Sequence, residues 1–292
     1  MRLFLALILT VPLLAETFKS ADGTVLHYDV IGGGAPVVLL SGGPGFSPDY
    51  LRPIAEKLAK KYQFILLHQR GTGRSSDATS LQMVKLVEDL EALRKTLDEP
   101  KLVLIGHSFG GIVSMMYARE HPDRVGMLVL IASGGPTLKS MMKFNATLES
   151  RFTAEEKASI AEWTARMKDD RARAVFEITK AKSAAYFADR SKARLLTDPM
   201  TVESFNDATF WALAPQMMAL DLRAGLEKVQ APVIVIHGKQ DPLESAQEVH
   251  ETFPASQLEL IDDAGHFPWL EQPEKFYKTL DGFLAMLYEH CP

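Results

Sequence analysis

Short apolar runs alternate with amphipathic segments along most of the chain. Continuous apolar runs of strand length, typical of strands buried on both faces, cover 36–40, 64–67, 101–106, 125–132, 232–237 and 258–261. Apolar residues at helical spacing cover 49–60, 81–97 and 109–121, and further helices are predicted from about 244 and after Pro273. Strands that alternate with helices predict an α/β fold, a mostly parallel sheet with helices on both faces.

Two parts of the chain depart from this alternation. Residues 16–31 alternate apolar with polar side chains around Ala21-Asp22-Gly23, which predicts a hairpin of two strands. From about Pro136 to Leu220, helix-forming residues dominate and no strand-like run occurs. We interpret this stretch as a helical cap inserted over the C-terminal ends of the strands, where open α/β sheets bind ligands. The predicted domains are a core in two parts, 16–135 and 221–292, with the cap at 136–220.

The first 15 residues have the pattern of a secretory signal peptide. Arg2 precedes an apolar stretch at 3–14, and the small residue Ala15 follows it. The stretch is shorter than the ~20 residues that a membrane-spanning helix needs, and Pro12 interrupts it. We therefore expect a signal peptide at 1–15, a mature chain that starts near Glu16, export to the periplasm or the medium, and no stable membrane anchor.

Composition narrows the classes of function. Of the 292 residues, 47% are hydrophobic and 24% are charged, as in an ordinary globular domain. The net charge is -5 and no Lys/Arg run stands out, which argues against nucleic acid as a partner, because phosphate binding needs a concentrated basic surface. With a single cysteine, Cys291, the chain can form neither an intrachain disulfide nor a cysteine zinc motif. No cofactor and no metal is indicated, and the oligomeric state is left open.

The segment Gly106-His107-Ser108-Phe109-Gly110 combines a G-x-S-x-G pattern with a predicted strand before it and a predicted helix after it. This context is that of a nucleophile elbow, a sharp turn in which the glycines avoid collisions and the serine hydroxyl stands above the sheet edge. The alternative is a glycine-rich strand-to-helix turn without chemistry. The context favours Ser108 as a nucleophile.

A nucleophilic serine needs a neutral imidazole to take its proton, and the imidazole needs an acceptor that fixes its tautomer. His266 lies in a loop directly after a predicted strand and follows Ser108 in the chain, as a general base should in this arrangement. Asp241 lies between the two in chain order, after the preceding predicted strand, and we assign it as the acid. Asp262 and Asp263 are rivals, but they lie too near His266 in the chain to support its ring from the side.

Attack on an ester or an amide also requires N–H donors for the developing oxyanion. One donor is the backbone N–H of Phe109, the residue after the nucleophile. The other is expected from the loop Ser41-Gly42-Gly43-Pro44-Gly45, which follows an early strand and whose glycines let the backbone approach a substrate. We assign this second donor to Gly43.

These segments, together with 68–75 and 263–269, resemble the α/β-hydrolase superfamily over nearly all the chain after the signal. Within it, Gly-Gly-Pro-Gly and Gln-Arg-Gly-Thr-Gly-Arg-Ser resemble the proline iminopeptidase-like branch. In that branch the oxyanion loop usually starts with histidine and the arginine loop with aspartate, where this chain has Ser41 and His68. The resemblance implies the α/β-hydrolase fold and an aminopeptidase activity.

We therefore expect a cofactor-free hydrolase that forms an acyl-enzyme on Ser108 and acts on a small molecule or a short peptide. Aminopeptidases of the branch hold the amine of the substrate with cap carboxylates. Glu149, Glu162, Glu177 and Glu203 are available, and Glu177 and Glu203 are the preferred candidates for a buried carboxylate, because each has apolar neighbours. A carboxylesterase for small neutral esters is the first alternative, and a non-catalytic ligand receptor is a remote one.

Overall fold

The computed structural model describes residues 14–78 and 80–289. The predicted signal peptide lies outside the described residues except for Leu14 and Ala15, which begin a strand. None of the helices in this part of the chain is both long and apolar enough to cross a membrane.

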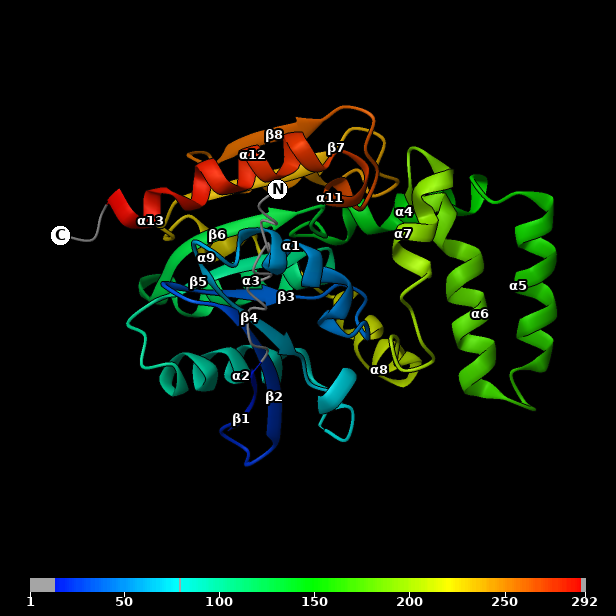
Figure 1. Ribbon diagram of the computed structural model, residues 1–292, viewed down its shortest axis with the longest axis horizontal. Coiled ribbons are helices and arrows are strands. Elements are labelled where there is room, and N and C mark those ends of the chain that lie inside the picture. The colour runs from blue at the N-terminus through cyan, green and yellow to red at the C-terminus, as the bar shows by residue number, and fades with distance from the viewer. Residues whose placement is uncertain (1–13, 79, 290–292) are drawn as a thin grey trace, which may run out of the picture.

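The described strands form one eight-stranded sheet in the order β1-β2-β4-β3-β5-β6-β7-β8 (Figure 1). The first two strands pair antiparallel, as the predicted hairpin requires, and β2 also runs antiparallel to β4. All the other neighbours are parallel, which confirms the predicted mostly parallel sheet. Strand boundaries agree with the predicted runs to within two residues: β1 (Leu14–Lys19), β2 (Val25–Gly32), β3 (Pro36–Leu40), β4 (Gln63–His68), β5 (Leu102–His107), β6 (Val125–Ile131), β7 (Val233–Gly238) and β8 (Gln257–Ile261).

The strand order reverses at β3, which has β4 on one side and β5 on the other. In open α/β sheets such a reversal opens a crevice at the carboxyl ends of the two diverging strands, and ligands bind there. The oxyanion loop follows β3 and the serine elbow follows β5. The topology therefore brings these two predicted loops to one place.

Helices cover both faces of the sheet, because side chains alternate between the faces along each central strand. On one face Leu102 and Leu104 join a buried cluster with α2 and α3, and on the other Val103 and Ile105 join a cluster with α1 and α12. The helices of the core are α1 (Arg52–Leu58), α2 (Met83–Thr96), α3 (Phe109–Glu120), α9 (Arg223–Leu226), α10 (Ala246–Thr252), α11 (Pro268–Glu271), α12 (Pro273–Leu284) and α13 (Met286–Glu289).

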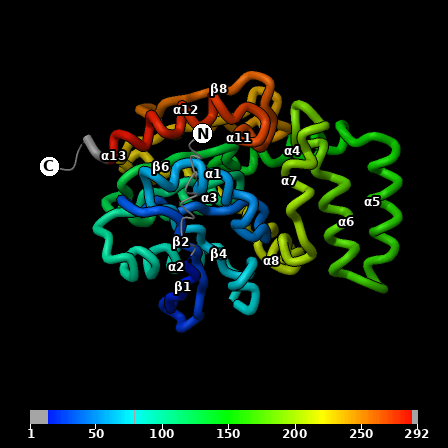
Figure 2. Tube along the Cα trace, in the orientation of Figure 1, coloured from blue at the N-terminus to red at the C-terminus, as the bar shows by residue number. Residues whose placement is uncertain are grey.

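The stretch between β6 and β7 forms the cap helices. They are α4 (Leu138–Ser150), α5 (Ala154–Arg166), α6 (Arg171–Ser183), α7 (Arg194–Thr197) and α8 (Asp207–Met217). Figures 1 and 2 show α5 and α6 at the far end of the molecule from most of the sheet. Hydrogen bonds to the rest of the chain include those from Thr209 of α8 to Gly71 and from Thr137, directly before α4, to Glu248.

Candidate active site

Ser108 stands at the turn from β5 into α3. Its φ of 54° and ψ of -115° lie in a region that residues with a side chain rarely adopt, at a cost of roughly 1–3 kcal/mol. The turn needs its glycines, because a Cβ on Gly106 would lie 2.4 Å from the carbonyl oxygen of Gly110, and a Cβ on Gly110 would lie 2.2 Å from that of Leu40. The sequence thus forms the sharp, strained elbow that the G-x-S-x-G pattern predicts.

Asp241 and His266 come together on the loops after β7 and β8. The Nδ1 of His266 lies 2.8 Å from Oδ2 of Asp241, and both residues are buried. The other carboxylate oxygen, Oδ1, accepts the backbone N–H of Leu243 at 2.8 Å. With Nδ1–H donated to Asp241, the neutral imidazole of His266 has its lone pair at Nε2, which is the tautomer that a general base requires.

A second histidine, His237, touches the same carboxylate. Its Nε2 lies 3.2 Å from Oδ2 of Asp241 and 2.8 Å from the carbonyl oxygen of Leu243. Because a carbonyl only accepts, Nε2 of His237 carries the proton. Burial lowers the pKa of His237, so that its ring stays neutral, with its N–H donated to the Leu243 carbonyl and its Nε2 near the Asp241 carboxylate.

The rival acids lie away from the imidazole. Asp262 and Asp263 are exposed, and Asp262 pairs with Lys239 at 2.6 Å. Neither aspartate forms a hydrogen bond with His266 in the described part of the chain. The geometry therefore favours Asp241 over both.

The loop after β3 lies against Ser108. A Cβ on Gly42 would come within 3.0 Å of the Cβ of Ser108, and the N–H of Gly42 donates to the hydroxyl of Tyr50 at 2.6 Å. Gly43 follows with a φ of 117°, which favours glycine, and its N–H makes no hydrogen bond with the rest of the described backbone. Phe109 is the first residue of α3, where N–H groups have no partner within the helix. Gly43, rather than Gly42, is therefore available as a donor beside Phe109.

His107, directly before Ser108, connects the loop after β3 with the loop that carries His266. The hydroxyl of Tyr50 lies 2.7 Å from Nδ1 of His107, and Nε2 of His107 lies 3.0 Å from the main-chain carbonyl of His266. His107 therefore donates from Nε2 and accepts on Nδ1. Burial, with the nearby His266, lowers the pKa of His107 well below its usual value, so its ring is neutral. Sequence reasoning considered only histidines that follow Ser108, although His107 lies inside the G-x-S-x-G pattern.

The two departures from the iminopeptidase-like pattern are both buried. Ser41 donates from Oγ to the carbonyl of Phe46 at 2.6 Å, and Gln69 donates from Nε2 to the carbonyl oxygen and Oγ of Ser41 at 2.9 and 3.0 Å. His68 lies with its Nε2 3.7 Å from Oδ2 of Asp29. Ser41 thus braces the oxyanion loop, and His68 faces a carboxylate on β2.

Arg70, the first arginine of the Gln-Arg-Gly-Thr-Gly-Arg-Ser segment, forms ion pairs that hold parts of the fold together. Arg70 is buried and pairs with Asp22 in the hairpin turn at 2.9 Å and with Asp89 on α2 at 2.6 Å. Burial raises the pKa of Asp89 despite this pairing. Arg70 therefore joins the hairpin to α2 and does not reach the reacting groups.

The cap presents aromatic side chains to the catalytic loops. The ring of Tyr186 lies 5.4 Å from that of His266, and the ring of Phe144 lies 6.4 Å from it, centroid to centroid. Phe205 forms an isolated β-bridge with Phe46 of the oxyanion loop, and their rings are 4.7 Å apart. The surroundings of His266 on the cap side are therefore apolar and aromatic.

The preferred cap glutamates lie apart from this group. Glu177 is on α6, more than two helical turns before Tyr186, and pairs with Arg173 at 2.5 Å. Glu203 is exposed, so the expectation that apolar neighbours bury it is wrong, because it lies in a surface turn between α7 and α8. No described contact joins either glutamate to His266.

A cavity of about 410 Å³ lies between α4, α5 and α6. Its lining includes the apolar Leu148 and Ile160 and the charged Glu149 and Lys182. Burial lowers the pKa of Lys182. Glu149, one of the four cap glutamates considered from the sequence, therefore shares its cavity with a cation.

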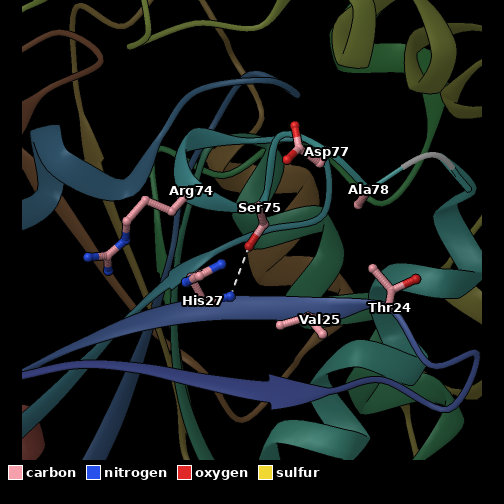
Figure 3. A pocket seen from close by; sticks show the side chains of 7 residues that line it. All are labelled: Thr24, Val25, His27, Arg74, Ser75, Asp77 and Ala78. Atoms are coloured by element: carbon pink, nitrogen blue, oxygen red, sulfur yellow. Dashed lines mark hydrogen bonds between the residues drawn. The ribbon is translucent and has the colours of Figure 1, made fainter.

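A second cavity, of about 360 Å³, lies beside β2 and is lined by Thr24, His27, Arg74 and Asp77, among others (Figure 3). The backbone N–H of His27 donates to the hydroxyl of Ser75 at 3.0 Å. Figure 3 shows Arg74 and Asp77 pointing in different directions, so their charges do not converge on one ligand position. None of the predicted catalytic residues lines this cavity.

Comparison with known proteins agrees with the fold. A family model described as alpha/beta hydrolase fold matches residues 35–273. A proline iminopeptidase of Saccharolobus solfataricus is 25% identical over 94% of this chain and 93% of its own. A pimeloyl-[acyl-carrier protein] methyl ester esterase of Vibrio vulnificus is 26% identical over 89% of this chain and 98% of its own. The solved structure of an esterase from Exiguobacterium antarcticum superposes with a TM-score of 0.70 at 24% identity, over 93% of this chain and 100% of its own.

Proposed function

Because the chain belongs to the alpha/beta hydrolase fold family and is a hydrolase, we propose that it works through an acyl-enzyme on Ser108. The observation that carries the proposal is the 2.8 Å contact between Nδ1 of His266 and Asp241, on loops at the same sheet edge as the strained serine. The hydroxyl of Ser108 makes no hydrogen bond with other described residues. In free enzymes such catalytic contacts are often loose and tighten when substrate binds.

The chemistry follows from these positions. Nε2 of His266 takes the proton of Ser108 as Oγ attacks the carbonyl carbon, and the N–H groups of Gly43 and Phe109 donate hydrogen bonds to the oxyanion. The imidazolium, which Asp241 stabilises, then donates its proton to the leaving group, and the acyl group stays on Oγ. Water attacks the acyl-enzyme with His266 as base and releases the acid.

We propose neutral esters as the substrate class. The cap rings near His266 are those of Tyr186 and Phe144, which suit an apolar acyl or leaving group. An ammonium that enters a partly closed pocket needs a carboxylate to offset its lost hydration. Of the described carboxylates, the one in contact with His266 is Asp241, whose oxygens already accept N–H groups. The similarity to the methyl ester esterase supports the same class.

An aminopeptidase of the proline iminopeptidase-like kind is the second candidate. It is favoured by the 25% identity to the Saccharolobus enzyme over 94% of this chain. Under this reading Glu177 or Glu203 binds the amine of the substrate, and the cap has to move to bring either one to the site.

A substrate panel tests the proposal. We expect p-nitrophenyl acetate and butyrate to be hydrolysed with kcat/KM at least about tenfold above that of prolyl-arylamide, one tenfold step being about 1.4 kcal/mol. Ser108→Ala should lower turnover by more than about 1,000-fold and leave the fold intact. Activity of Ser108→Ala within about tenfold of the parent would exclude the acyl-enzyme.

The same panel decides between the two substrate classes. If prolyl-arylamide is the better substrate, and Glu177→Gln or Glu203→Gln lowers its kcat/KM by about 100-fold while aryl acetate hydrolysis is unchanged, the aminopeptidase is correct. If prolyl-arylamide is not cleaved, or both variants cleave it normally, the esterase stands.

We also propose that the protein is exported through the predicted signal peptide at 1–15, on the pattern of Arg2, the apolar stretch and Ala15. N-terminal sequencing of the periplasmic or secreted fraction should give a start near Glu16. A cytosolic chain that keeps Met1 would contradict export.

A further inference from the structure

Glu271 is a carboxylate buried where the cap meets the loop that carries His266. It ends α11 and is 1% exposed. Its Oε2 accepts the backbone N–H of Gly265 at 2.6 Å, and its Oε1 accepts those of Ala188 and Asp189 at 2.8 and 3.0 Å. One carboxylate therefore binds both the residue before His266 and a segment of the cap.

Further contacts join the same two segments. The N–H of His266 donates to the carbonyl of Tyr186 at 2.9 Å, and Nζ of Lys192 donates to the main-chain carbonyl of Glu271 at 2.7 Å. A Cβ on Gly265 would lie 2.2 Å from the carbonyl oxygen of Tyr186, so the cap backbone rests directly on the loop. The two segments pack as one unit around Glu271.

Both oxygens of the Glu271 carboxylate act as acceptors. Burial raises the pKa of Glu271, and the three backbone donors together with the charge of Lys192 oppose that rise. The three N–H groups come from both the cap and the loop, so the carboxylate links the two segments.

We propose that Glu271 is a positioning residue for His266. Its carboxylate holds the cap segment 186–189 and the Gly265–His266 backbone in a fixed relative position, so that the cap helps to set the position of the imidazole. The inference rests on the proposed role of His266 as general base. Asp241 holds the ring of His266 through Nδ1, whereas Glu271 holds the main chain that precedes it. A displacement of about 1 Å in such a group can lower turnover by about 100-fold.

Glu271→Gln tests the proposal, because it keeps the size of the side chain but replaces one acceptor oxygen with an NH₂ that faces an N–H donor. We expect kcat for p-nitrophenyl acetate to fall roughly 10- to 100-fold with KM changed less than about twofold. Labelling of Ser108 by a fluorophosphonate should slow equally. Amide hydrogen exchange should rise together at Gly265, Ala188 and Asp189. A kcat within about twofold of the parent, or faster exchange at Gly265 alone, overturns the proposal.

A control variant separates positioning from general stability. Leu280→Ala empties a buried position on α12 and should lower the melting temperature at least as much as Glu271→Gln does, with kcat within about threefold of the parent. A loss of kcat in this control as large as that in Glu271→Gln contradicts a specific role of the carboxylate.

Ala188→Pro provides a second route if Glu271→Gln does not fold. It removes one N–H donor to Glu271, and the preceding Phe187, with φ of -96° and ψ of 145°, tolerates a following proline. We expect kcat to fall about three- to tenfold and amide hydrogen exchange at Gly265 to become faster. If neither kcat nor the exchange rate changes, the proposal is overturned. Amide hydrogen exchange is measured without substrate. It therefore tests the link between the cap segment and the Gly265–His266 backbone separately from the esterase proposal.

Discussion

The imidazole of His107 donates a hydrogen bond from Nε2 to the main-chain carbonyl of His266 over 3.0 Å. On its other side, Nδ1 accepts from the hydroxyl of Tyr50, which accepts from the N–H of Gly42. One neutral ring thus connects the loop of the proposed base with the loop of the proposed oxyanion donor. His107, which directly precedes Ser108, therefore helps to hold both loops in place beside Ser108.

Tyr50→Phe should break this connection. It leaves the buried N–H of Gly42 and Nδ1 of His107 without a partner, at about 1–3 kcal/mol for each buried group. We expect kcat for aryl esters to fall about tenfold and the free energy of unfolding to fall by about 1–3 kcal/mol, measured by steady-state kinetics and urea unfolding. Tyr277→Phe is the control. It removes a hydrogen bond from the tyrosine hydroxyl to the carbonyl of Pro53 and should leave kcat within about twofold of the parent. Equal kinetic effects of the two variants would contradict the role of Tyr50.

Asp241→Asn should lower turnover by up to about 10,000-fold, because an amide favours the wrong tautomer of His266. The fold should persist, since the Leu243 N–H can still donate to the amide oxygen. Asp262→Asn and Asp263→Asn are the controls, and both should stay within about threefold of the parent because these side chains are exposed. A crippling effect of either control would mean that Asp241 is not the acid.

The elements of the fold could be predicted from sequence because each carries a local signal. The strand at Pro36–Leu40 is a continuous apolar run with both ends as predicted, and the hairpin turn shows as Asp22-Gly23. The position of β2 between β1 and β4 could not be predicted, because it depends on pairs such as His27 with His68, which are far apart in the chain.

The residues of the candidate site, too, could be predicted only where they carry a local signal in the sequence. Ser108 and His266 could be found from motif and chain order. Tyr50 and Glu271 could not, because their roles come from hydrogen bonds across long separations, 57 residues to His107 and 83 to Ala188. The burial of Glu203 was predicted wrongly because apolar neighbours in sequence do not fix how a surface turn directs its side chains.

Gly110→Ala should destabilise the elbow. An added Cβ would lie 2.2 Å from the carbonyl oxygen of Leu40, a backbone atom that cannot move aside cheaply. We expect a loss of roughly 1–3 kcal/mol in unfolding free energy, with lower kcat because the Phe109 N–H shifts. Gly282→Ala on α12 is the matched control: a Cβ there meets nothing within 4 Å, so it should stabilise by about 0.5–1 kcal/mol. Similar stability changes in both variants would contradict the close approach at Gly110.

Glu91 of α2 should make the stability of the fold depend on pH. A hydrogen bond from Arg94 lowers the pKa of Glu91 to about 2, with further contributions from Tyr117 and the charge of Arg124. The carboxylate thereby joins α2 to α3 and to the segment before β6.

Because the pKa of Glu91 is lower in the folded than in the unfolded chain, its contribution to stability is complete above about pH 5 and is lost as the pH falls toward about 2. We expect Glu91→Gln to reduce the unfolding free energy by about 1–2 kcal/mol at pH 7 and by roughly half as much at pH 3, measured by urea unfolding. Glu162→Gln, which breaks an exposed pair with Arg166, should change stability by less than about 0.5 kcal/mol at either pH. A Glu91→Gln effect of the same size at pH 7 and pH 3 would show that packing, not charge, carries the contribution.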